Sequence, residues 1–220
     1  MTQAQETIGF VGVGLMGHGM AKNLVEKGFP LTVMAHRNRA PVEDLVARGA
    51  TEAQSLEAMA GACSIIFLCL TGSPEVSAAV AALKPGLKRG SVIIDCSTSD
   101  PTVTERLAGE LADLGVDFAD APLSRTPKEA WEGKLDCMVG ASDAVFARIE
   151  PVIGAWAGKI VHMGGVGDGH KMKLLNNFIS LGYAALYSEA LALSRKVGIP
   201  AAAFDKVIRG GRMDCGFYQT

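Results

Sequence analysis

The sequence lacks the features that mark several classes of protein. Its five cysteines are scattered and odd in number, without a C-x-x-C pair, so we expect reduced thiols in a cytoplasmic protein. Aromatic residues make up only 6% and the net charge is −2, which gives no electrostatic reason to bind nucleic acid. The first residues lack the basic and apolar regions of a signal peptide. The apolar runs stop well short of the roughly 18 residues that a membrane span needs.

A metal site is not expected either. The four histidines, His18, His36, His162 and His170, lack the spacing of metal ligands, and we interpret each as a surface or packing residue. The sequence also gives no grounds for a Ser-His-Asp arrangement or for a pair of catalytic carboxylates. Any chemistry must therefore come from other residues, with or without an organic cofactor.

The hydrophobic residues, 49% of the 220, fall into short apolar runs that alternate with segments of helical spacing. We expect strands at residues 7–12, 31–35, 63–70, 92–95, 116–119 and 159–162. Helices are expected at residues 15–27, 41–48 and 143–155, and another that opens at Pro101 behind an Asp100 cap. Strands and helices that alternate in this way indicate repeated βαβ units and a mostly parallel sheet.

The pattern changes after Met163. A glycine-rich hinge, GGVGDGH, leads into a long helix predicted over Lys171–Val197, and a second helix follows over Ala201–Arg209. We therefore predict an α/β protein with a Rossmann-type, mostly parallel sheet domain over residues 1–163. The start of an all-helical domain is predicted over residues 164–220.

The first chemical motif is GVGLMG, in which Gly12, Gly14 and Gly17 form G-x-G-x-x-G. The motif ends a predicted strand and opens a predicted helix, which is the context that dinucleotide binding requires. Gly12 permits a tight turn, Gly14 lets the backbone approach a pyrophosphate, and Gly17 lets the helix pack closely on the strand. We assign these glycines, with Leu15 and Met16 between them, to cofactor binding; the alternative is a simple strand–helix turn.

The end of the second predicted strand favours NADP(H) over NAD(H). NAD sites usually carry an acid about 20 residues beyond the glycines, but no acid lies between Glu26 and Glu43. The run His36-Arg37-Asn38 stands there instead, and the guanidinium of Arg37 is suited to bind a 2′-phosphate with two hydrogen bonds. The alternative is a solvated basic turn.

The long helix carries the third motif. Lys173 and Asn177 are four residues apart and so share one helix face, beside Asn176. A lysine next to amides on an otherwise apolar helix is unusual, and we interpret it as functional rather than as a surface lysine. The side chain of Lys171 is expected to point elsewhere.

Together, these motifs resemble those of the β-hydroxyacid dehydrogenase family. The similarity is carried by residues 10–23 (FVGVGLMGHGMAKN), 94–98 (IDCST), 120–124 (DAPLS) and 165–177 (GVGDGHKMKLLNN). The resemblance implies that Lys173 is the acid/base residue and that Asn177 orients the substrate.

The same resemblance implies further contacts. It places Ser124 and its neighbours on the acid group of the substrate, and it places Leu70, Thr71 and Thr98 on the cofactor. Reduction of an aldehyde requires a hydride on carbon and a proton on oxygen, and a protonated lysine supplies the proton.

One stretch departs from the family pattern. Where the family usually has Ser-Gly-Gly, this sequence has Ser124-Arg125-Thr126. An arginine adds a fixed cation suited to a second or stronger anion, and the Arg-Thr pair resembles the sulfolactaldehyde reductase branch. The alternative is that Arg125 forms a structural ion pair with Glu129 or Glu132.

A second departure is length, since family members continue for several more helices. The chain is thus expected to be truncated, and to form a homodimer or homotetramer through its helical region. The resulting prediction is an NADP(H)-preferring oxidoreductase that interconverts a small β-hydroxy acid and its semialdehyde. The alternatives are an imine-reductase-like enzyme and a non-catalytic, cofactor-binding scaffold.

Overall fold

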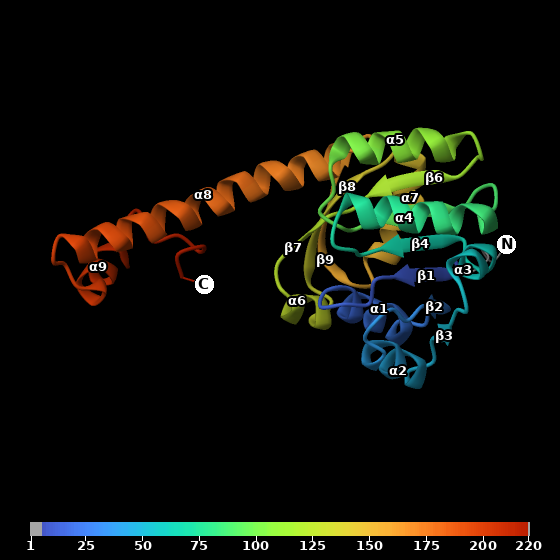
Figure 1. The fold of residues 1–220 in the computed structure, drawn as a ribbon, viewed down its shortest axis with the longest axis horizontal. Coiled ribbons are helices and arrows are strands. Elements are labelled where there is room, and N and C mark those ends of the chain that lie inside the picture. Colours follow the sequence, from blue (N-terminus) through green and yellow to red (C-terminus); the bar gives the residue numbers. More distant parts are fainter. Residues whose placement is uncertain (1–5, 220) are drawn as a thin grey trace. The chain divides into compact units, whose positions relative to one another are not determined.

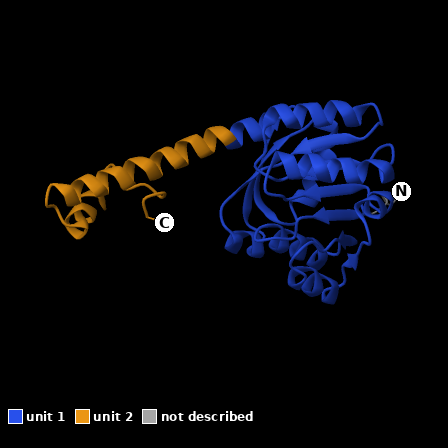
Figure 2. Cartoon of the chain, in the orientation of Figure 1, with its two compact units in different colours: residues 1–173 blue, residues 174–220 orange. Residues whose placement is uncertain are grey.

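The computed structural model describes residues 6–219. Contacts between residues divide the chain into a first unit, residues 1–173, and a second unit, residues 174–220 (Figure 2). The division falls within helix α8 (Asp168–Lys196), which continues from one unit into the other. The domain boundary expected after residue 163 stays a prediction.

The first unit is built on one sheet (Figure 1). Its strands are β1 (Ile8–Val11), β2 (Leu31–Val33), β3 (Thr51–Glu52), β4 (Ile65–Leu68), β5 (Val92–Asp95), β6 (Asp117–Asp120), β7 (Leu123–Ser124), β8 (Leu135–Gly140) and β9 (Ala157–Gly164). They lie in the order β3-β2-β1-β4-β5-β6-β8-β7, and β9 pairs with β8. Strands β1 to β6 are parallel, whereas β8 runs antiparallel to β6 and β7. The mostly parallel Rossmann-type sheet is therefore confirmed.

Helices cover both faces of this sheet. They are α1 (Gly17–Glu26), α2 (Ala40–Ala47), α3 (Leu56–Ala62), α4 (Ser73–Leu83), α5 (Pro101–Ala112), α6 (Pro127–Glu132) and α7 (Asp143–Ile153), with a 3-10 turn, η1 (Lys84–Gly86). Helix α5 begins as predicted, because the Asp100 side chain accepts a hydrogen bond from the backbone N–H of Thr102 behind Pro101. The sequence pattern did not predict β3, β7, β8, α3, α4 or α6. Of these, β3 and β7 are only two residues long, too short for a periodic signal.

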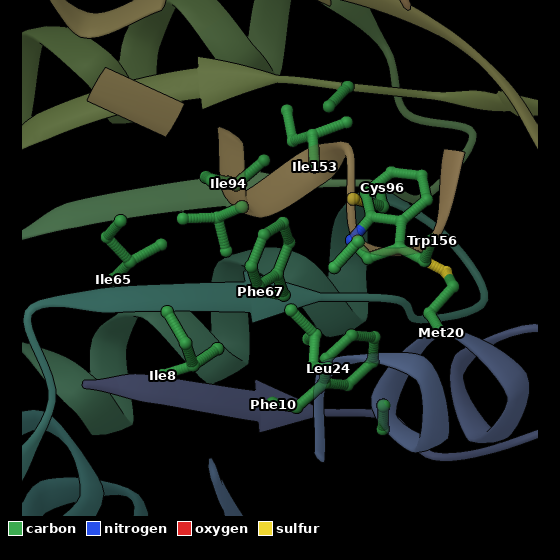
Figure 3. Close-up of a cluster of buried hydrophobic side chains, with 14 of the residues drawn as sticks. Ile8, Phe10, Met20, Leu24, Ile65, Phe67, Ile94, Cys96, Ile153 and Trp156 are labelled. Atoms are coloured by element: carbon green, nitrogen blue, oxygen red, sulfur yellow. The ribbon is translucent and has the colours of Figure 1, made fainter. Parts of the chain in front are cut away.

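Alternate residues of the central strands face two separate cores, as expected for a sheet with helices on both sides. In one core, Phe10 and Phe67 pack with side chains of α1, α2 and α7. Figure 3 shows Phe67 beside Trp156, with ring centroids 6.0 Å apart in an edge-on arrangement. The other core joins Ile66 and Ile93 to α3, α4 and α5. Both faces of the strands are thus fixed, and the carboxyl ends of β1 to β6 lie along one edge.

The second unit is helical. It contains the remainder of α8 and helix α9 (Ala201–Ile208). Tyr187 donates a hydrogen bond to the backbone carbonyl of Met213 at 2.6 Å, and its ring lies beside that of Tyr218. The all-helical segment predicted after the sheet domain is therefore confirmed. No helix in residues 6–219 combines the length and the apolar composition needed to cross a membrane.

Candidate active site

The glycine-rich turn follows β1 and leads into α1. Gly12 has φ +96°, and a Cβ at Gly12 would overlap the backbone carbonyl of Cys69, while one at Gly17 would overlap that of Gly12. A Cβ at Gly14, in contrast, would have no atom within 4 Å. The turn is therefore closed toward the strands and open on its outer side. Met16, the residue before α1, forms no side-chain cap, so the positive end of the helix can face an anion.

These features fit the pyrophosphate of a dinucleotide. A side chain at Gly14 would fill the open space that the phosphates need, and a side chain at Gly12 or Gly17 would push the turn off the strands. Leu15, between the glycines, is 85% exposed, which leaves a large apolar side chain beside the open face.

The carboxyl end of β2 carries the basic residues predicted to select the cofactor. His36, Arg37 and Asn38 are all exposed. A pocket here is lined by Met34, Ala35, His36, Arg39, Glu52, Ala53 and Gln54. Although no acid lies between Glu26 and Glu43 in the sequence, strand β3 brings a carboxylate to this end of β2. Glu52 Oε2 lies 3.0 Å from a guanidinium nitrogen of Arg39. Sequence reasoning missed Glu52, because its approach to Arg39 depends on the pairing of β3 with β2.

The loops after β4 and β5 lie next to each other because their strands are paired. The backbone N–H of Leu70 donates to Ser97 Oγ at 2.9 Å. Thr71 and Thr98 are exposed. The structure thus places these three predicted cofactor contacts on two loops linked by a hydrogen bond.

Arg125 occupies a strained turn after β7. Its φ of +88° lies in the left-handed region that favours glycine, and among residues 6–219 no other non-glycine residue has a positive φ. Its Nε lies 2.9 Å from Asp136 Oδ2 on β8. Arg125 thus forms a structural ion pair, but with Asp136 rather than with Glu129 or Glu132, because the pairing of β7 with β8 brings Asp136 to it.

Ser124 and Thr126 flank this arginine. Ser124 ends β7 and is partly buried. Thr126 caps α6: its hydroxyl accepts the backbone N–H of Lys128, and its own N–H donates to Glu129 Oε2 at 3.0 Å. Thr126, predicted to bind substrate, thus already has a structural function. The hydrogen bonds from Thr126 lower the pKa of Glu129, and the charge of Arg125 also contributes to lowering it.

The first turns of α8 hold two lysines in different surroundings. Lys171 is exposed, and its amine lies 2.9 Å from Glu105 and 3.1 Å from Asp168, which raises its pKa. Lys173 is partly buried, and burial lowers its pKa. No carboxylate within residues 6–219 lies in ion-pair distance of the Lys173 amine. Asn176 and Asn177 follow on the same helix, in the second unit, and both are partly buried.

A buried polar cluster at the start of α8 was missed. Asp95, Asp120 and His170 are completely buried, so His170 is a packing residue and not a surface one. The available signal was position, since Asp95 and Asp120 each end a short apolar strand at the same edge of the sheet. Among the described residues, no group of three or more His, Cys, Asp or Glu side chains could hold a metal ion.

Comparison with known proteins places the chain among dehydrogenases and reductases. Residues 7–165 match the family described as the NAD-binding domain of 6-phosphogluconate dehydrogenase. The chain is 37% identical over 205 residues to 2-(hydroxymethyl)glutarate dehydrogenase of Eubacterium barkeri, covering 91% of this chain and 67% of that one. It is 31% identical over 216 residues to 3-sulfolactaldehyde reductase of Escherichia coli, covering 97% of this chain and 72% of that one.

The fold agrees with these similarities. The structure of 3-hydroxyisobutyrate dehydrogenase from Mycobacterium tuberculosis, determined with L-serine, superposes with a TM-score of 0.87. It is 27% identical in sequence, and the match covers 98% of this chain and 74% of that one. The likeness therefore extends through the sheet and into the helical segment.

Proposed function

Because the chain belongs to the β-hydroxyacid dehydrogenase family of NAD(P)-dependent oxidoreductases, we propose that it interconverts a small β-hydroxy acid and its semialdehyde. The observation that carries this proposal is Lys173, a partly buried lysine with a lowered pKa. It lies in the first unit, which also holds the glycine turn and the two predicted cofactor loops. A partly buried amine without a carboxylate partner is typical of a proton donor or acceptor rather than of a structural ion pair.

The cofactor supplies or accepts the hydride when it is bound. The backbone of residues 12–17 would hold its pyrophosphate, because the open side of the turn has room there and the α1 N-terminus attracts anions. Leu70, Thr71 and Thr98 would lie on its nicotinamide side.

Lys173 would handle the proton. In the reductive direction its ammonium donates a proton to the carbonyl oxygen as that oxygen becomes the alcohol. In the oxidative direction the neutral amine takes the same proton back. A free lysine has a pKa near 10.4, so the lowered pKa favours the oxidative role at a more accessible pH without removing the reductive one.

Arg125 supports a substrate with a second or stronger anionic group, that is, a second carboxylate or a sulfonate. Its side chain is half exposed and held by one exposed ion pair with Asp136, an interaction worth only about 0–1 kcal/mol. A carboxylate or sulfonate of the substrate can therefore replace Asp136 at little cost. The names of the two relatives fit this class of substrate, since a glutarate has two carboxylates and the one anionic group of sulfolactaldehyde is a sulfonate. Ser124, Thr126, Asn176 and Asn177 are proposed as the other substrate contacts.

We also propose that NADP(H) is preferred. Arg39 is occupied by Glu52 and Glu43, which leaves exposed Arg37, with His36 and Asn38, to meet a 2′-phosphate. Because Arg39 offsets the charge of Glu52, this carboxylate is a weaker barrier to the phosphate than an unpaired acid would be.

Association into a homodimer or homotetramer through the helical region stays a proposal. The second unit exposes large apolar side chains, among them Phe178 at 80%, Leu181 at 68% and Leu186 at 69%, which are typical of a surface that another chain covers. A cytoplasmic location is also a proposal, and it is based on the scattered free thiols.

A steady-state assay tests the function. The purified chain is given NADPH or NADH with a panel of semialdehydes that carry one carboxylate, two carboxylates, or a carboxylate or hydroxyl with a sulfonate. Turnover on at least one, with the matching hydroxy acid as product, supports the proposal. Cofactor binding without turnover on the panel, or with turnover only on cyclic imines, would count against it and favour the scaffold or imine-reductase alternative.

A further inference from the structure

The first turn of α8 is capped from a different element of the fold. Asp120 ends β6, and its two carboxylate oxygens accept the backbone N–H groups of Gly167 and His170, each at 2.6 Å. A helix N-terminus leaves such N–H groups without helical partners, and its dipole favours a negative charge there. Asp120 therefore fixes the start of α8 to the carboxyl edge of the sheet.

His170 adds a second link from the same turn. Its ring is completely buried. Nε2 lies 3.1 Å from the backbone carbonyl of Ser97 and Nδ1 lies 2.8 Å from Thr104 Oγ1. Since a carbonyl can only accept, Nε2 carries a hydrogen and donates it to Ser97. The ring is thus held between the loop after β5 and helix α5.

Ser97 continues this chain of hydrogen bonds. Its hydroxyl accepts the N–H of Leu70 at 2.9 Å, and its own N–H donates to Asp95 Oδ1 at 2.9 Å. His170 therefore connects the start of α8 to the loops after β4 and β5. These two loops carry the predicted nicotinamide contacts Leu70, Thr71 and Thr98.

Close packing leaves this turn little freedom to move. A Cβ at Gly169 would lie 2.5 Å from the carbonyl oxygen of Met138 and 2.8 Å from Asp120 Oδ2. A Cβ at Gly140 would overlap Asp120. Real Cβ contacts essentially never come so close, so the helix backbone approaches β8 without any side chain between them.

We propose that Asp120 and His170 are positioning residues, which fix the first turn of α8 relative to the two cofactor loops and thereby set the position of Lys173 on the following turn. The inference rests on the proposed role of Lys173, which follows His170 by three residues and so lies on the adjacent turn of the same side of the helix. Neither residue is assigned a contact with substrate or cofactor. Their effect on the reaction is transmitted through the backbone of α8.

The test uses the full chain and graded variants. His170→Leu removes both ring hydrogen bonds, His170→Gln retains a donor that can reach Ser97, and Thr104→Val removes one partner at nearly constant shape. Asp120→Asn replaces one of the two acceptors of the α8 cap. The matched control is Glu105→Gln. It removes the exposed ion pair between Glu105 on α5 and Lys171, which lies on the same first turn of α8 as His170.

Four quantities are measured: hydrogen exchange of residues 167–173 by mass spectrometry, the dissociation constant for NADPH, kcat and KM. We expect His170→Leu to speed exchange in residues 167–173 and to lower kcat on the order of ten- to a hundredfold, since small displacements of a catalytic group carry such costs. Cofactor affinity and KM are expected to change little. His170→Gln should recover part of kcat, and Glu105→Gln should leave all four quantities near wild type.

Two results would overturn the inference. One is kcat in His170→Leu and Thr104→Val within about twofold of wild type, well short of the expected ten- to hundredfold fall. The other is exchange that rises across the whole first unit, with cofactor affinity lost in parallel, which indicates a role in stability alone. If Asp120→Asn does not fold, His170→Leu and Thr104→Val still test the anchor of α8 through His170.

Failure of the proposed function is distinguishable from failure of this inference. If the wild-type chain turns over no substrate, the proposed function fails, and exchange of residues 167–173 in His170→Leu still tests the anchor. If the wild type is active and Lys173→Ala is not, but His170→Leu keeps full kcat, the proposed function stands and the positioning role is wrong.

Discussion

Two regions of the proposed site are built in opposite ways. Around the start of α8, Asp120 and His170 are completely buried and paired through short hydrogen bonds. At the end of β2 and in the turn at Arg125, the charged side chains are largely exposed and meet as ion pairs. Breaking a buried hydrogen bond to a charged group costs about 1.5–3 kcal/mol, whereas an exposed ion pair is worth about 0–1 kcal/mol.

This difference separates two tasks. A proton donor must be held within a fraction of an ångström to act, and the buried network provides that rigidity. Selection of a substrate or cofactor requires charges that a ligand can recruit, and exposed pairs such as Arg125–Asp136 can be exchanged at low cost. We therefore expect substitutions near α8 to change the rate for every substrate, and those in the exposed regions to change preference.

The largest expected effect comes from Lys173→Ala. Loss of a general acid typically lowers the rate by about 10²–10⁴-fold, so kcat should fall by roughly a thousandfold in steady-state assays with the best substrate. The control is Lys171→Ala, two residues away, where an exposed lysine held by Glu105 and Asp168 is removed. If kcat fell equally in the two variants, the loss in Lys173→Ala could not be assigned to a role of Lys173 as the proton donor.

The next effect distinguishes substrates. In Arg125→Met, which keeps length but removes the charge, kcat/KM for aldehydes with a second carboxylate or with a sulfonate should fall on the order of tens of fold, the equivalent of a lost charged hydrogen bond. Substrates with a single carboxylate serve as the internal control and should be affected much less. If both classes of substrate lose activity equally, Arg125 does not recognise the second carboxylate or the sulfonate.

A third prediction concerns pH. Burial lowers the pKa of Lys173 below its usual value, and the neutral amine is the form that accepts a proton. The oxidative kcat/KM should therefore rise about tenfold per pH unit and level off above that pKa, while the reductive rate falls through the same range. In Lys173→Arg, which stays protonated, this dependence should disappear. Profiles of the same shape in both proteins would assign the titration to another group.

The sequence predicted the features that depend on local patterns, and it did not predict those that depend on contacts between distant segments. Apolar runs of strand length and the placement of GVGLMG between a strand and a helix are local patterns, and they predicted the Rossmann-type sheet correctly. The partners of exposed charges depend on pairings between short strands, so Glu52 beside Arg39 and Asp136 beside Arg125 could not be predicted. His170 gave no signal either, because its burial results from the packing of α8 on the sheet.

A smaller effect is expected for cofactor preference. Arg37→Ala should lower the ratio of kcat/KM for NADPH to that for NADH by roughly tenfold, as for one lost charge-assisted hydrogen bond. Arg39→Ala is the matched control, because Arg39 is already held by Glu52 and Glu43. A ratio that is unchanged in Arg37→Ala would contradict the NADP(H) assignment.

The smallest expected effect is on stability, at the turn itself. At φ +88°, a residue with a Cβ is strained by about 1–2 kcal/mol, whereas glycine is not. Arg125→Gly and Arg125→Ala both lose the ion pair with Asp136, so a comparison between them isolates the backbone. Glycine loses more entropy on folding, which offsets about 0.5–1 kcal/mol of this advantage. We still expect the glycine variant to unfold at higher urea concentration than the alanine variant, with a free energy of unfolding that is larger by up to about 1 kcal/mol. If alanine were the more stable, the turn would not hold Arg125 in the left-handed conformation, and the position of its guanidinium beside Asp136 would need another explanation.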